Sequence, residues 1–83
     1  MIEIWGKTGC PHCDAAKRLC ETRGLVYTYK QLGVDFEREA VLEEFPGART
    51  FPQIKVNGTA IGGYDKLGPY LEETNYNGTG YAL

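Results

Sequence analysis

The residues with the clearest chemical potential are the cysteines of the segment Cys10-Pro11-His12-Cys13. If Cys10 caps a helix, Cys10 and Cys13 lie one turn apart and can form a disulfide, which needs Cα atoms within about 7 Å of each other. The third cysteine, Cys20, lies about 10 Å further along that helix and is out of reach of both. We therefore predict a reversible Cys10–Cys13 dithiol and a small apolar role for Cys20 on the inner face of the helix. A static disulfide or half of a metal site is the alternative for the pair.

The predicted helix start gives the two cysteines different roles. A sulfur at the N-cap accepts hydrogen bonds from the free N–H groups of His12 and Cys13, and the helix dipole favours its negative charge. Pro11 fits the first helical position, and Lys7 and a protonated His12 add positive charge. We expect Cys10 to be the attacking thiolate and Cys13 the resolving thiol. A solvated Lys7 and an exposed His12 without a role are the alternatives.

Length and charge exclude several classes of protein. The chain has 83 residues with a formal net charge of −2, whereas proteins that bind nucleic acid through phosphates are basic. No apolar run approaches the roughly 18 residues of a membrane span, and the first residues lack the pattern of a signal peptide. We expect a cytosolic protein without a nucleic-acid or membrane partner. The Asn-Gly-Thr tripeptides at Asn57 and Asn77 are then chance matches to the glycosylation pattern.

The elements around the cysteines alternate between strand and helix patterns. Residues 2–5 and 25–32 are rich in strand formers, residues 10–24 form a helix between them, and Asp35 caps a second helix that ends near Phe45. Residues 53–56 and 59–61 flank Asn57-Gly58, the preferred hairpin turn. A last helix lies between Tyr64 and Glu73, where Gly68-Pro69 either delays its start or kinks it. We predict one α/β domain over residues 1–83 in the order β-α-β-α-β-β-α, with a four-stranded mixed sheet, helices on its faces and a loosely held tail at 75–83.

Three segments carry a family resemblance. They are Ile4 to Cys13, Ala48 to Gly58 and Ile61 to Leu67, in this order and at this spacing. Over residues 1–73 the sequence resembles the glutaredoxins, in particular the short bacterial and phage-type members. The resemblance implies a thioredoxin-like fold with three helices around the sheet.

The resemblance also implies a glutathione site. The proline matching Pro52 is cis in the family and lies beside the nucleophile, so that the backbone of Phe51 pairs with the cysteine of glutathione. The glycine carboxylate would meet Lys7 and Arg38. The complete implied set is Lys7, His12, Arg38, Thr50, Phe51, Pro52, Gly62, Gly63, Tyr64 and Asp65. Redox tuning is expected from Lys7, Pro11, His12 and Pro52.

Gly62-Gly63 and Asp65, which belong to that set, can also be explained without a ligand. Gly62-Gly63 precedes a predicted helix, whose free amides can hold the second carboxylate of glutathione. Asp65 would bind the ammonium group of the ligand and also cap the helix. Taken without the resemblance, the glycines would be a turn and Asp65 a cap only.

Three positions depart from the family pattern. His12 stands where Tyr is usual, Phe51 where Val is usual, and Gly6 where Thr or Ser is common. Phe51 is expected to act through its backbone, so glutathione binding should survive its change. For His12 we hypothesise that it stabilises the Cys10 thiolate and makes the disulfide more oxidising.

The predicted function is that of a monomeric, glutathione-dependent thiol–disulfide oxidoreductase without a metal. It would reduce protein disulfides and glutathione mixed disulfides, with ribonucleotide reductase as the protein substrate that the resemblance suggests. One alternative is a redoxin served by thioredoxin reductase, although such proteins usually lack the Gly-Gly-x-Asp element found at 62–65. Another is a dimer bridged by an iron–sulfur cluster on Cys10 and glutathione. An internal zinc site would need Cys10, His12, Cys13 and Cys20 together, and the predicted helix puts Cys20 out of reach of the other three.

Overall fold

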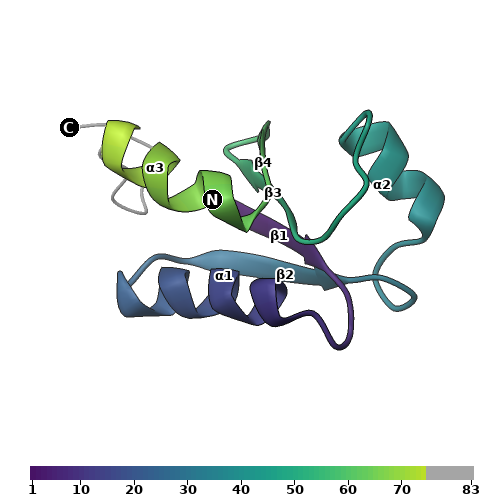
Figure 1. The fold of residues 1–83 in the computed structure, drawn as a ribbon, viewed down its shortest axis with the longest axis horizontal. Coiled ribbons are helices and arrows are strands. Elements are labelled where there is room, and N and C mark those ends of the chain that lie inside the picture. Colours follow the sequence, from purple (N-terminus) through teal and green to yellow (C-terminus); the bar gives the residue numbers. More distant parts are fainter. Residues whose placement is uncertain (75–83) are drawn as a thin grey trace.

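The computed structural model describes residues 1–74, so the predicted loose tail at 75–83 and the Asn77 tripeptide lie outside the described residues. The elements follow the predicted order (Figure 1). They are β1 (Ile2–Gly6), α1 (Pro11–Thr22), β2 (Tyr27–Gln31), α2 (Arg38–Glu44), β3 (Gln53–Val56), β4 (Thr59–Gly62) and α3 (Tyr64–Thr74). Among these residues no helix is both long and apolar enough to cross a membrane.

The sheet is mixed, as predicted, with the strand order β2-β1-β3-β4. β1 and β2 run parallel and α1 connects them, while β1–β3 and β3–β4 are antiparallel. The hairpin between β3 and β4 turns at Asn57 and Gly58, whose φ values are 52° and 83°. Two successive positive φ values are the signature of the turn that Asn-Gly favours.

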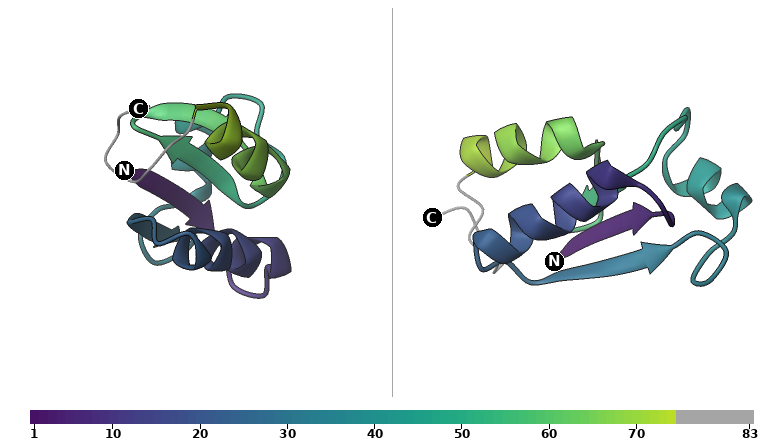
Figure 2. Two further views of the ribbon diagram at one scale, coloured as in Figure 1. Left: turned by 90° about the vertical axis from the view of Figure 1, so that its left-hand side faces the viewer. Right: turned by 60° about the horizontal axis from the view of Figure 1, so that its bottom comes forward.

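The main core lies between the sheet and the pair α1 and α3, which pack against each other along it (Figure 2). The alternation of β1 sends Ile2 and Ile4 into this core, and every second residue of β3 joins them. The buried members are Ile2, Ile4, Ala16, Cys20, Leu25, Ile54, Val56, Leu67 and Leu71. This packing fixes the start of α1, and with it the cysteines, against the end of β1.

A second, smaller hydrophobic cluster lies toward α2. This helix stands at the end of the molecule opposite to the C-terminal end of α3 (Figures 1 and 2). Trp5 points away from Ile4 on β1 and meets Phe36 and Phe45 at ring-centroid distances of 4.7 and 5.5 Å. Val41 completes the buried set. The loop that follows α2 is thereby held beside the start of α1.

The prediction that Asp35 caps the second helix is wrong. The Asp35 carboxylate accepts a hydrogen bond from the backbone N–H of Gln31 at 2.8 Å, which closes a turn before the helix. α2 starts at Arg38, and its N-cap, Glu37, makes no side-chain capping bond. The local turn outcompetes the cap because an Asp side chain bonds nearby backbone in either arrangement.

Gly68-Pro69 does not delay the last helix. α3 begins at Tyr64 and contains Pro69 in its interior. Leu67 and Leu71 on its inner face are buried in the main core. Tertiary packing therefore carries the helix past a residue that lacks a backbone donor.

Candidate active site

Cys10 occupies the N-cap of α1, as predicted. Its backbone is extended (φ −108°, ψ 104°), and its sulfur accepts a hydrogen bond from the Cys13 N–H at 3.1 Å. Pro11 follows as the first residue of the helix. The sulfur therefore sits where free amides and the helix dipole stabilise a thiolate.

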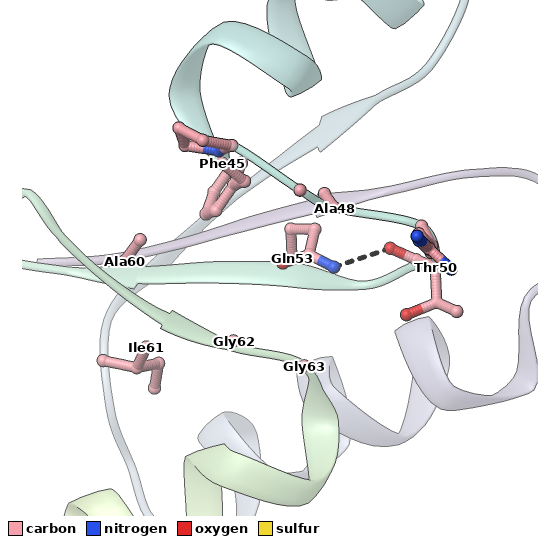
Figure 3. A pocket seen from close by; sticks show the side chains of 11 residues that line it. Phe45, Ala48, Thr50, Gln53, Ala60, Ile61, Gly62 and Gly63 are labelled. Carbon is pink, nitrogen blue, oxygen red and sulfur yellow. Dashed lines mark hydrogen bonds between the residues drawn. The ribbon is translucent and has the colours of Figure 1, made fainter.

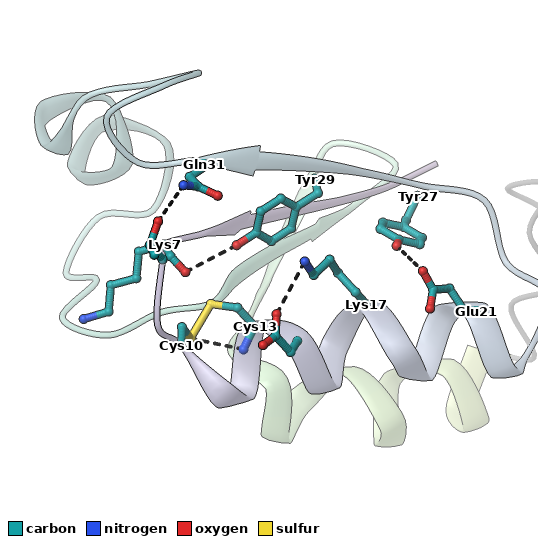
Figure 4. Close-up of polar contacts among 10 residues, drawn as sticks. Lys7, Cys10, Cys13, Lys17, Glu21, Tyr27, Tyr29 and Gln31 are labelled. Carbon is teal, nitrogen blue, oxygen red and sulfur yellow. Dashed lines mark hydrogen bonds and ion pairs between the residues drawn. A yellow bond between two sulfur atoms is a disulfide. The ribbon is translucent and has the colours of Figure 1, made fainter.

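The predicted pairing of the cysteines is confirmed by a Cys10–Cys13 disulfide with the Cα atoms 5.2 Å apart (Figure 4). Cys10 keeps 7% of its surface exposed, whereas Cys13 has none. A substrate sulfur approaching from solvent therefore meets Cys10 first. This difference supports the assignment of Cys10 as the attacking and Cys13 as the resolving residue.

Cys20 is a free, buried cysteine in the main core, as predicted. Burial, with a smaller contribution from the charge of Glu21, raises the pKa of its thiol to about 11. A neutral buried thiol is inert in disulfide exchange. Within residues 1–74 no three His, Cys, Asp or Glu side chains gather into a group that could hold a metal ion.

The backbone of Phe51 borders the reactive sulfur. Its carbonyl oxygen lies 3.7 Å from Cys10 Sγ, and the Phe51–Pro52 peptide bond is cis, as the resemblance implied. The Phe51 ring packs beside Phe36, with the ring centroids 6.3 Å apart. The second apolar cluster thus anchors the residue whose backbone faces the disulfide.

A cationic cavity of about 440 Å³ lies on one side of Phe51. Lys7 and Arg38, predicted together from the resemblance, both line it, and Lys7 Nζ is 6.0 Å from the centre of the Phe51 ring. Arg49 lines the same cavity and was missed by the sequence reasoning. Its signal was its place directly before Thr50-Phe51-Pro52, inside a segment that the resemblance had already singled out.

A second cavity of about 440 Å³ lies on the other side and shares Thr50 and Phe51 with the first. Its remaining lining residues are His12, Pro52, Gly63, Tyr64 and Asp65. His12 stacks on Tyr64 with the ring centroids 5.9 Å apart and the planes 18° apart. Asp65 is the second residue of α3, two positions after the N-cap, so the expectation that it caps this helix is wrong.

Gly62 lies apart from this second cavity. It lines a neighbouring pocket of about 530 Å³ between the hairpin and the loop after α2, which Gly63 and Thr50 also border (Figure 3). In that pocket the Gln53 side-chain amide donates to the Thr50 carbonyl at 2.8 Å. This bond holds the backbone that leads to Phe51. Nine of the ten residues predicted to bind glutathione thus border the two cavities that meet at Phe51, and Gly62 borders the third.

Comparison with known proteins agrees with this geometry. The family model described as glutaredoxin matches residues 2–61. A probable glutaredoxin from Synechocystis is 42% identical over 67 residues, which cover 80% of this chain and 62% of that protein. This chain therefore spans less than two thirds of the length of that relative.

Two solved structures share the fold and more than a quarter of the sequence. The solution structure of reduced Escherichia coli glutaredoxin superposes with a TM-score of 0.76 at 29% identity, covering 89% of this chain and 95% of that one. A buckwheat glutaredoxin–glutathione complex superposes with a TM-score of 0.70 at 28% identity, covering 87% and 68%. The chain, with its helix-capping disulfide, belongs to the glutaredoxin family.

Proposed function

We propose that this protein uses glutathione to reduce protein disulfides and glutathione mixed disulfides through Cys10 and Cys13. The observation that carries the proposal is the position of Cys10 Sγ. It accepts a hydrogen bond from the Cys13 N–H in the first turn of α1 and lies 3.7 Å from the carbonyl oxygen of Phe51, the residue that borders both cavities. A thiolate there is both stabilised and accessible to an extended peptide.

The reaction follows from the two cysteines. The Cys10 thiolate attacks one sulfur of the substrate disulfide, and the other substrate sulfur leaves as a thiolate. The Cys13 thiolate then attacks Cys10 Sγ, which closes the internal disulfide and releases the second substrate thiol. Two glutathione molecules reduce this disulfide in turn, the first forming a mixed disulfide on Cys10 and the second leaving as part of oxidised glutathione.

The two cavities suit the two ends of glutathione. Lys7, Arg38 and Arg49 offer positive charge to the glycine carboxylate on one side of Phe51. On the other side, Asp65 offers a negative charge to the ammonium group of the ligand. The bound glutathione of the buckwheat relative supports this assignment by similarity.

The resolving role of Cys13 is tested by Cys13→Ser. The variant should keep exchange with glutathione mixed disulfides and lose most direct reduction of protein disulfides, by at least about a hundredfold, because only the second reaction needs the resolving thiol. Both activities are measured with glutathione and glutathione reductase, and in parallel with thioredoxin reductase. Full dithiol activity in Cys13→Ser, or turnover by the parent with thioredoxin reductase alone, would contradict the proposal.

We propose ribonucleotide reductase as the protein substrate to test first. We also propose that the protein acts as a monomer in the cytosol, a compartment that keeps dithiols reduced.

A further inference from the structure

β1 ends without a side chain at Gly6, at the point where it passes Cys13. A Cβ placed on Gly6 would lie 2.9 Å from Cys13 Sγ and 2.5 Å from the hydroxyl oxygen of Tyr29. Real Cβ atoms do not approach other atoms this closely. The hydroxyl of Tyr29 and the resolving sulfur therefore share the space that a side chain at position 6 would fill.

Tyr29 reaches this space from β2, and its ring is held from the side of α1 (Figure 4). Lys17 Nζ lies 4.2 Å from the centre of the Tyr29 ring and 3.4 Å from an Asp14 carboxylate oxygen. The Tyr29 hydroxyl donates to the Lys7 carbonyl at 3.5 Å, longer than the usual 2.5–3.0 Å for such a bond. The hydroxyl thus makes only a long hydrogen bond to Lys7, and it shares the space beside Gly6 with the Cys13 sulfur, which is a stronger acceptor when Cys13 is a thiolate.

Cys13 needs such a donor more than Cys10 does. The sulfur of Cys13 is fully buried, and the backbone N–H of Cys13 donates its hydrogen bond to the sulfur of Cys10. A buried thiolate without a hydrogen-bond donor is costly. On α1, the Lys17 ammonium group and the Asp14 carboxylate pair with each other at 3.4 Å.

We propose that Tyr29 is a positioning residue for the resolving step, an inference that rests on the proposed function. In the reduced protein its hydroxyl donates a hydrogen bond to Cys13 and favours the thiolate. That thiolate attacks Cys10 Sγ of the mixed disulfide, the bond from Cys10 to the substrate sulfur breaks, and the substrate leaves as a thiolate. Tyr29 keeps its proton throughout, and the proton of the Cys13 thiol passes to the leaving thiolate or to water.

Tyr29→Phe removes the hydroxyl and keeps the ring under Lys17. Reduced protein is mixed with oxidised glutathione in a stopped-flow instrument, where one glutathione leaves as Cys10 is modified and a second as Cys13 closes the disulfide. We expect the second release to slow about tenfold, as loss of a hydrogen bond to a charged group would cause. The first release should change less than about twofold, because it needs only Cys10.

Tyr27→Phe is the matched control, because Tyr27 lies two residues earlier on the same strand and its hydroxyl donates to Glu21 at 2.6 Å. It should leave the second release unchanged. An unchanged second release in Tyr29→Phe, or an equal slowing in Tyr27→Phe, overturns the inference.

A rescue separates a hydroxyl donor from a merely structural ring. The ring atom Cε1 of Tyr29 would also lie 2.9 Å from a Cβ at Gly6, so a new side chain there requires Tyr29→Leu. Cys13 Sγ, also 2.9 Å from that Cβ, must still shift, and it must do so equally for serine and alanine. Tyr29→Leu alone should slow the second release, and adding Gly6→Ser should restore it to within about threefold of the parent. Adding Gly6→Ala should not. Equal rescue by both overturns the inference, whereas a parent without any first release would instead contradict the proposed function.

Discussion

At the scale of single residues, the site distinguishes two cysteines of one disulfide by exposure, hydrogen bonding and neighbours. The sulfur of Cys10 accepts a hydrogen bond from a helix amide and lies beside the Phe51 carbonyl, while the sulfur of Cys13 is buried beside Gly6. His12 lies between them in sequence, yet its ring stacks on Tyr64. His12 is thereby held at the rim of the cavity that contains Asp65.

His12→Tyr tests whether this residue sets the redox potential. A positive or hydrogen-bonding imidazole near Cys10 favours the reduced form, so the variant should have a reduction potential more negative by about 30 mV, equal to a tenfold shift in its equilibrium with glutathione. The potential is measured by equilibrating parent and variant in glutathione buffers of known composition. His12→Phe keeps an aromatic ring for Tyr64 and should behave like His12→Tyr. A potential equal to or above that of the parent in both variants would exclude the tuning role.

At the scale of elements, the sequence predicted those features that depend on interactions between neighbouring residues. The Cys10-Pro11 start of α1 and the Asn57-Gly58 turn were predictable because caps and tight turns depend on a few adjacent residues. The prediction that Asp35 caps the second helix was wrong because its carboxylate had two local options, the helix cap or the turn at Gln31. The sequence alone did not show which of these hydrogen bonds is preferred. Arg49 was missed for a different reason. Its position depends on how the loop after α2 packs against Trp5, which is a contact between distant segments.

Gly68→Ala should stabilise the protein. Gly68 lies inside α3, and a Cβ there would meet no atom within 4 Å. Alanine restricts the unfolded chain and has the higher helix propensity, so the free energy of unfolding should rise by about 0.5–1 kcal/mol. Urea denaturation followed by circular dichroism measures the change.

Gly58→Ala provides the contrast, because Gly58 also has open space but a φ of +83°. It should destabilise the protein, since alanine is strained at positive φ. A loss of stability in Gly68→Ala would show that α3 uses its glycine for a bend at Pro69.

At the scale of the whole molecule, α1 and β2 share an alkaline-sensitive contact around Glu21. The Tyr27 hydroxyl donates to the Glu21 carboxylate at 2.6 Å, and this bond, with burial, raises the pKa of Tyr27 to about 12. Burial raises the pKa of the Cys20 thiol from 9.0 to about 11. Both groups thus hold their protons longer in the folded protein than in the unfolded chain.

Stability should therefore fall as the pH rises from 9 to 11. In that range the unfolded chain loses the Cys20 proton while the folded protein keeps it, which costs up to about 2 kcal/mol of the free energy of unfolding. Oxidised protein is used, so that the Cys10–Cys13 disulfide does not titrate, and urea midpoints are measured across the range. Cys20→Ala should lower stability at neutral pH and flatten its decline up to pH 10. An equally steep decline in Cys20→Ala would assign the alkaline loss to other groups.

The chain has one tryptophan, and the fold places it in the smaller cluster with Phe36, Val41 and Phe45 rather than in the main core. Intrinsic fluorescence is then an optical reporter of the end of the molecule that carries Arg38 and leads to Phe51, whereas circular dichroism is dominated by α1 and α3. With only four buried side chains, this end should open first, and the fluorescence midpoint in urea should lie up to about 1 M below the dichroism midpoint. Saturating glutathione should raise the fluorescence midpoint and so reduce the difference between the two midpoints. Coincident midpoints without glutathione would mean that both clusters unfold as one unit.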